Sequence, residues 1–112
     1  MGEQKVMRKG HPADKAKNPK CRHGKSCCPH STKGKYTQGS PNVYVDNRPL
    51  VRVGDEFAHD DKCCDSNKGT AAKGSTKVTC NNRPVHRDKD RTKHCGGDGK
   101  GDGGCPKVLA GP

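Results

Sequence analysis

Histidine and cysteine are the residues of this chain whose types and spacing could do chemistry. The sequence of 112 residues contains eight Cys and six His. Most of them fall in three polar segments, at residues 10–39, 55–74 and 90–104. Neutral imidazoles and thiolates are the ligands that tetrahedral Zn²⁺ prefers in proteins, and iron is the alternative metal. These residues therefore indicate a closed, structural metal site.

Two of the three segments share one ligand spacing. The first reads His-Gly-Lys-Ser-Cys-Cys at 23–28 and the second reads His-Asp-Asp-Lys-Cys-Cys at 59–64. The predicted ligands begin with His59 and His94, which an internal repeat places at one register. Either His23 or His30 could supply a third ligand, and a fourth could come from Cys28, Cys64 or Cys95. His11 and His86 are expected to be surface residues, and Cys80 is expected to be a small residue of the core.

An internal repeat must position these groups. Residues 39–59 read GSPNVYVDNRPLVRVGDEFAH and residues 74–94 read GSTKVTCNNRPVHRDKDRTKH, with nine of 21 positions identical at an offset of 35. Each copy predicts a short β-hairpin, because Asp46-Asn47 and Asn81-Asn82 tolerate the left-handed backbone of a tight turn. The three polar segments are predicted to be loops between the hairpins.

A third copy is split between the two ends of the chain. Residues 104–110 read GCPKVLA and match the opening GSPNVYV, while residues 6–10 resemble residues 50–54. The sequence therefore predicts a single domain over 1–112, with units at 39–73, at 74–103, and at 6–38 joined to 104–112. Three such units would close into a ring in which the terminal segments pair as neighbouring strands. The expected fold is an all-β, three-fold pseudo-symmetric cone of short hairpins with long loops, stapled by metal.

Composition agrees with a stapled fold. Only 26% of the residues are apolar and three are aromatic, which is too little for an ordinary core. No apolar run is long enough for a signal peptide or a membrane span, so the chain is expected to be made in a reducing bacterial cytoplasm, where cysteine more often indicates metal than disulfide. The formal charge of +11 favours solubility over a specific anionic partner, because the cations are diffuse and no aromatic platform accompanies them.

The repeat resembles the PAAR-repeat family. The family's Pro-Ala-Ala-Arg tetrad corresponds to Pro49-Leu50-Val51-Arg52 and Pro84-Val85-His86-Arg87, although neither keeps the Ala pair. The run Cys28-Pro29-His30 resembles the family's Cys-Pro and His loop, which favours His30 and Cys28 as the remaining ligands and leaves His23, Cys64 and Cys95 as alternates.

This resemblance implies a structural tip protein rather than an enzyme. One copy would cap the blunt, three-fold end of a trimeric β-helical spike in a type VI secretion system or a contractile phage tail. The protein would then lie in the baseplate or tail tip, or be secreted with the spike, and would touch the target membrane transiently. The implied docking face consists of apolar strand residues: Val43, Val45, Val51, Val53, Val78 and Val108.

Two other hypotheses about function compete with that of a spike-tip protein. The first is a zinc-binding, basic nucleic-acid module, which the charge and the Cys/His content suggest, although no Cys-x2-Cys pair spaced for a zinc ribbon or finger is present. The second is a disulfide-stapled secreted peptide, which the even number of cysteines suggests. Ser40, Asp55 and His59 recur in the second copy, so repetition explains them without a catalytic triad.

Overall fold

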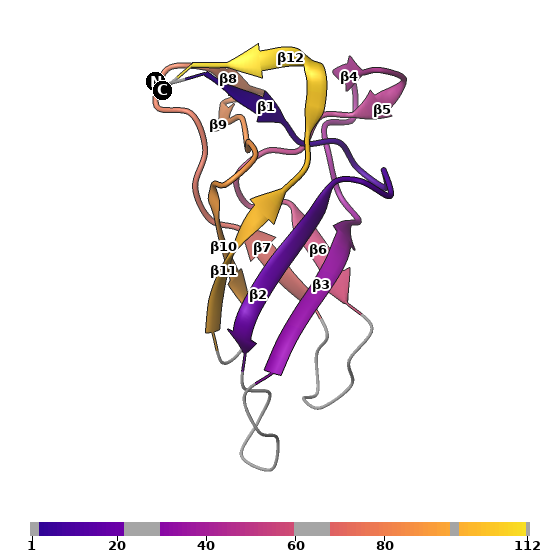
Figure 1. Ribbon diagram of the computed structural model, residues 1–112. Helices are drawn as coiled ribbons and strands as arrows, with labels where there is room; N and C mark the ends of the chain where they lie inside the picture. Colours follow the sequence, from indigo (N-terminus) through magenta and orange to yellow (C-terminus); the bar gives the residue numbers. More distant parts are fainter. Residues whose placement is uncertain (1–2, 22–29, 60–67, 95–96, 112) are drawn as a thin grey trace.

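The computed structural model describes residues 3–21, 30–59, 68–94 and 97–111. Within these ranges every regular element is a β-strand, and no helix is present that could cross a membrane. The strands are β1 (Gln4–Val6), β2 (Lys15–Cys21), β3 (His30–Tyr36), β4 (Tyr44–Val45), β5 (Arg48–Pro49), β6 (Glu56–His59), β7 (Lys68–Ala71), β8 (Thr79–Cys80), β9 (Arg83–Pro84), β10 (Arg91–His94), β11 (Gly97–Asp102) and β12 (Cys105–Ala110). They form two parts along the molecule, a base of three ribbons and a barrel below it (Figure 1).

The base consists of three two-stranded antiparallel ribbons, β4–β5, β8–β9 and β1–β12. Asp46 and Asn47 have φ of 53° and 65°, and Asn81 and Asn82 have φ of 54° and 65°. Positive φ at both central residues is the requirement of the type I′ turn, whose twist matches that of the flanking strands. The predicted hairpin turns are therefore confirmed at both sites.

The third ribbon joins the two ends of the chain. β1 pairs with β12 in antiparallel register, with Gln4 opposite Ala110 and Lys5 opposite Leu109. Both ends consequently lie at the base (Figure 1). The expectation that the terminal segments pair as neighbouring strands is thus correct.

The barrel is closed by six strands in the order β10-β11-β2-β3-β6-β7. Three hairpins build it, β2–β3, β6–β7 and β10–β11, and they occupy much of the segments predicted to be loops. Its interior takes small residues and two aromatic rings, since Ala16, Tyr36, Phe57, Ala71 and Thr92 are all at most 1% exposed. Gly69 passes directly against the Phe57 ring, where any side chain would collide with it.

A cyclic set of backbone hydrogen bonds marks the centre of the molecule. The Met7 N–H donates to the His86 carbonyl at 3.1 Å, the His86 N–H donates to Val51 at 3.0 Å, and the Val51 N–H donates to Met7 at 3.0 Å. All three residues are fully buried. Each is the same position of one unit, so the ring is a pseudo-three-fold axis. The prediction of an all-β, three-fold pseudo-symmetric cone is confirmed.

Three buried arginine–aspartate pairs repeat about this axis, namely Arg8–Asp14, Arg52–Asp55 and Arg87–Asp90. In each pair the aspartate accepts three hydrogen bonds, from the arginine backbone N–H, from Nε and from Nη2, at 2.7 to 3.0 Å. Both side chains of every pair are at most 9% exposed. Paired and hydrogen-bonded in this way, the buried charges fix the turns that connect the base to the barrel.

Two apolar clusters form the core. The base cluster consists of Val6, Val45, Leu50, Cys80, Val85, Cys105 and Ala110. The barrel cluster consists of Met7, Ala16, Tyr36, Val51, Phe57 and Ala71. Cys80 is 7% exposed, as expected for a small core residue.

Candidate functional site

The ribbons of the base carry the large apolar side chains that are exposed in the described part of the chain. Val43, Val78 and Val108 are 38%, 39% and 39% exposed, and they occupy one position of the three units. Tyr44 and Leu109 lie beside them and are 59% and 50% exposed. The base therefore presents a three-fold arrangement of apolar groups that the fold itself leaves uncovered.

Serine side chains hold this face in shape. Ser40 Oγ accepts the Val43 backbone N–H at 2.9 Å, and Ser75 Oγ accepts the Val78 backbone N–H at 2.9 Å. Both serines are 1% exposed. Since the two valines are tied at equivalent positions, their spacing is set by the backbone rather than by flexible side chains.

Three residues proposed for this face lie elsewhere. Val51 is fully buried on the pseudo-three-fold axis and Val45 packs in the base cluster, so both are covered within the chain. Val53 is partly exposed and lies two residues after the axial residue Val51, outside the ribbon β4–β5. The sequence pattern missed Tyr44, because β4 has only two residues, and Leu109, because residues 106–109 of β12 are all exposed and show no alternation.

The backbones of the three predicted histidine ligands lie at the end of the barrel far from the base. His59 is the last residue of β6, His94 is the last residue of β10, and His30 is the first residue of β3. Cys28 and the alternates His23, Cys64 and Cys95 lie outside the described residues. The backbone thus brings three imidazole-bearing positions to one end of one barrel (Figure 1).

Their registers are related by the repeat. His59 and His94 each follow the aspartate of a buried ion pair by four residues, and Asn18 holds that place in the third unit. His59 and His94 therefore share one register, whereas His30 lies four residues along β3 from Gly34, which pairs with His59.

Among the side chains that the structure describes, no group of three His, Cys, Asp or Glu could hold a metal. His11 is partly exposed, and its Nδ1 accepts the Ala13 N–H at 3.0 Å. His86 was expected at the surface, and this is wrong, because its side chain is fully buried. Its position corresponds to Met7 and Val51 on the axis, where the fold leaves no route to solvent.

His86 makes the hydrogen bonds that its burial demands. Nδ1 lies 2.7 Å from the carbonyl oxygen of Lys73, which can only accept, so Nδ1 carries the proton. Nε2 then accepts from the Tyr36 hydroxyl at 2.7 Å. The Tyr36 ring packs edge-on against the imidazole with centroids 5.3 Å apart. The neutral imidazole therefore joins the axis of the base to the interior of the barrel.

This burial predicts a pH dependence of stability. Burial lowers the pKa of His86 below its ordinary value of 6.5, although the Lys73 carbonyl and the carboxylates of Asp90 and Asp55 oppose the shift and Arg87 adds to it. Below pH 6.5 the unfolded chain takes up a proton that the folded chain refuses. The free energy of unfolding should therefore fall as the pH falls from 6.5 towards the lowered pKa, by up to about 1.4 kcal/mol per pH unit.

Urea unfolding at pH 7.5 and 5.5 measures this effect. The variant His86→Met carries the residue of the equivalent position in another unit and cannot titrate there. It is expected to lose about 1 kcal/mol less than the parent over that interval. An equal loss in both proteins would assign the pH dependence to other groups.

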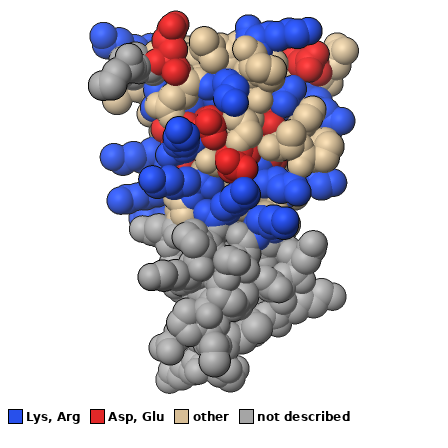
Figure 2. Space-filling view, viewed as in Figure 1, with Lys and Arg blue, Asp and Glu red and all other residues tan. Residues whose placement is uncertain are grey.

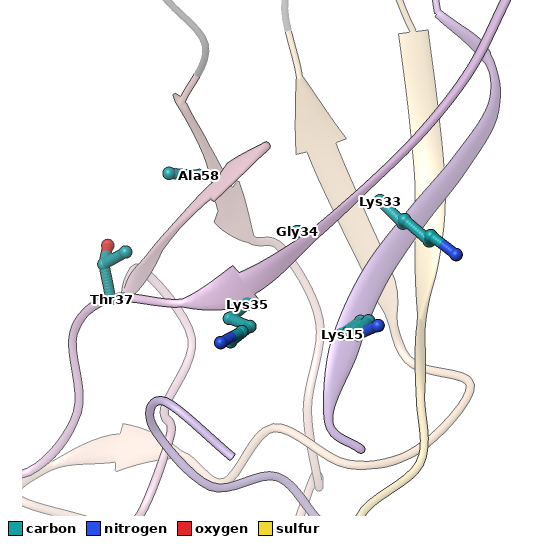
Figure 3. Close-up of a pocket in the computed structure, with 6 residues that line it drawn as sticks. All are labelled: Lys15, Lys33, Gly34, Lys35, Thr37 and Ala58. Carbon is teal, nitrogen blue, oxygen red and sulfur yellow. The ribbon is translucent and has the colours of Figure 1, made fainter. Parts of the chain in front are cut away.

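A depression of about 200 Å³ lies on the barrel wall at strands β2, β3 and β6 (Figure 3). Its lining consists of Lys15, Lys33, Gly34, Lys35, Thr37 and Ala58. Figure 3 shows three lysines that project from the neighbouring strands β2 and β3. The lining contains no carboxylate, imidazole or thiol, so this depression offers no acid–base pair.

Comparison with known proteins gives one finding. The family model described as the PAAR motif matches residues 29–98, which is more than half of the chain. No curated protein and no solved structure matches the chain. The matched range contains both complete copies of the repeat, their turns and the two buried ion pairs at Arg52 and Arg87.

Proposed function

Because this chain belongs to the PAAR-motif family of spike-tip structural proteins, we propose that one copy caps the blunt end of a trimeric β-helical spike. The host apparatus would be a type VI secretion system or a contractile phage tail. In this role the base docks on the spike and the barrel points forward. The protein acts as a structural part and catalyses no reaction.

The symmetry of the base carries this proposal. Val43, Val78 and Val108 lie at equivalent positions around the pseudo-three-fold axis and are nearly equally exposed. A trimer presents three identical copies of each surface group around a true three-fold axis. A single chain can match that arrangement only if it repeats its own contact residues three times, as this base does. The apolar character of the contacts suits an interface whose centre excludes water.

The interior of the protein suits mechanical load. The base and the barrel share one axial ring of hydrogen bonds and three buried ion pairs, so a push along the axis meets bonded backbone rather than a flexible linker. The His86–Tyr36 contact adds a side-chain link across the same junction. Such a body can transmit force from the spike to its leading end.

A single acidic substitution on the base tests the docking. Val78→Glu should weaken binding to the spike trimer of the same particle by about 2 kcal/mol, or roughly 30-fold, because it buries an unpaired carboxylate in the interface. Ala58→Glu is the matched control, since it places the same charge on the partly exposed barrel wall. Co-purification and titration calorimetry would measure both.

The two outcomes are easily told apart. Loss of binding in Val78→Glu alone, with both variants melting within a few degrees of the parent, supports docking through the base. Equal binding by both variants would place the spike contact elsewhere or remove it.

The far end of the barrel is proposed to hold a structural metal. His59, His94 and His30 would supply imidazoles and Cys28 a thiolate, with His23, Cys64 and Cys95 as alternates. The shared register of His59 and His94, together with the place of His30 at the start of β3, supports this set. Zn²⁺ fits such nitrogen and sulfur donors, and Fe is the other candidate. A metal there would tie the ends of three barrel strands together and leave no open position for catalysis.

A further inference from the structure

Cations gather on the outer wall of the barrel. Among the barrel side chains that the structure describes, eight cations lie at exposed or partly exposed positions, called here the cationic collar: Lys15, Lys17, Lys33, Lys35, Lys68, Arg91, Lys93 and Lys100. Glu56 and Asp102 are the acidic residues at such positions among the barrel side chains that the structure describes. On the face seen in Figure 2, Lys and Arg side chains crowd the barrel, whereas the base mixes both signs with uncharged residues.

The collar holds like charges directly opposite one another. Arg91 faces Lys100 across β10 and β11, Lys100 faces Lys17 across β11 and β2, and Lys17 faces Lys33 across β2 and β3. Lys15 faces Lys35 in the next row. Directly opposed like charges weaken a sheet. Lys17 is relieved by Asp102 at 3.0 Å, but both side chains are more than half exposed and the pair is weak.

Binding of an external polyanion would neutralise the row Arg91, Lys100, Lys17 and Lys33 and so stabilise the sheet. Its members lie on four consecutive strands of a closed barrel, and Lys68 continues the cations onto β7. The positive charge therefore wraps around most of the barrel instead of lying along one side. A partner that contacts the barrel from several directions at once would match this distribution of charge.

We propose that the cationic collar binds the phosphate-bearing headgroups of an anionic membrane surface. The position of the collar on the forward part of the molecule rests on the proposed function, in which the base faces the spike. Lysine suits this partner, because a flexible ammonium group adapts to headgroups that have no fixed geometry. Each lysine near an anionic leaflet contributes roughly a fivefold gain in partitioning, and the gain is lost at high salt.

Nucleic acid fits the collar less well. Single strands need exposed aromatic rings on which their bases stack. Of the three aromatic residues in the chain, Tyr36 and Phe57 are buried in the barrel and Tyr44 lies on the base. Base stacking is thus unsupported, and attraction to the phosphates of a duplex remains for the DNA arm of the test.

Vesicle binding by matched variants tests the proposal. Lys33→Gln/Lys100→Gln removes two collar charges, and Lys77→Gln/Lys107→Gln removes two charges beside Val78 and Val108 on the base. Co-sedimentation at low salt would use vesicles of phosphatidylcholine with phosphatidylglycerol, vesicles of phosphatidylcholine alone, and duplex DNA of mixed sequence. Circular dichroism confirms that each variant is folded.

The parent should bind the anionic vesicles and not the neutral ones. The collar variant should lose roughly 20- to 30-fold in partitioning, and the base variant should stay within about threefold of the parent. Equal losses in both variants would show that diffuse charge alone is responsible and would overturn the proposal, as would no binding at all. Tighter binding to DNA than to anionic vesicles, lost in the collar variant, would assign the collar to nucleic acid instead. The assay needs no spike, so these outcomes are independent of docking through the base.

Discussion

Replacement of Asp14 by alanine is expected to destabilise the protein by about 3–5 kcal/mol, a large share of the 5–15 kcal/mol that holds a typical domain folded. Asp14 is fully buried and accepts three hydrogen bonds from Arg8. It also accepts the Gly104 backbone N–H at 2.9 Å, which ties the first part of the chain to the last. Alanine would leave the 4%-exposed Arg8 guanidinium without its main counter-charge. Urea unfolding at pH 7.5 would measure the loss.

Asp46→Asn provides the matched control. Asp46 reaches the same guanidinium at 3.2 Å, but its side chain is 54% exposed. Asparagine also tolerates the positive φ of 53° at this turn, so the substitution removes charge without adding strain. Its cost should stay below about 1 kcal/mol, as for other exposed ion pairs. A loss in Asp14→Ala no larger than that of Asp46→Asn would show that the buried pairs contribute little to stability.

Removal of metal is the second change with a large expected effect. The native protein should contain about one zinc or iron per chain, and a chelator under reducing conditions should lower its free energy of unfolding. The loss would be about 4 kcal/mol relative to protein with free metal at about a thousand times Kd. Elemental analysis, a thiol count and urea unfolding with and without chelator would measure it together.

Histidine variants separate a metal effect from general damage. His59→Ala and His94→Ala should each lower the metal content and the unfolding midpoint, whereas His11→Ala should change neither. His11 is a suitable control, because it is partly exposed and precedes β2, at the end of that strand nearer the base. Metal-free protein that unfolds at the same midpoint as the native protein would refute the metal site. So would a thiol count showing that the cysteines are disulfide-bonded.

The repeat made the base predictable from sequence. Nine identities at an offset of 35 fixed the equivalence of two units, and the Asp-Asn and Asn-Asn turns fixed their hairpins. The barrel escaped prediction because its strands lack apolar alternation. Their inward positions hold Gly34, Gly69 and Gly101, together with Ala16 and Thr92, and their outward positions hold lysines. Residues of this kind read as loop, and only closure of the barrel reveals that the small ones face inward.

The candidate site was only partly predictable for the same reason. The fold places three exposed valines at one position of the repeat, but the pattern could not show that Val45 and Val51 point into the two clusters. His86 was misread because the other complete copy has valine there, and a polar residue opposite an apolar one suggests a surface. Its partners Tyr36 and Lys73 are 50 and 13 residues away in the sequence, so no local pattern predicts these hydrogen bonds.

The pairing of β1 with β12 also constrains the order in which the molecule can form. The hairpins β4–β5 and β8–β9 close over two-residue turns and can fold while the rest of the chain is still being synthesised. Gln4 must wait for Ala110, which leaves the ribosome among the last residues of this sequence. Bringing such distant segments together costs about 4 kcal/mol in loop-closure entropy. The ribbon β1–β12 should therefore form only after translation has passed β12, and Gln4 and Lys5 have no strand partner until then.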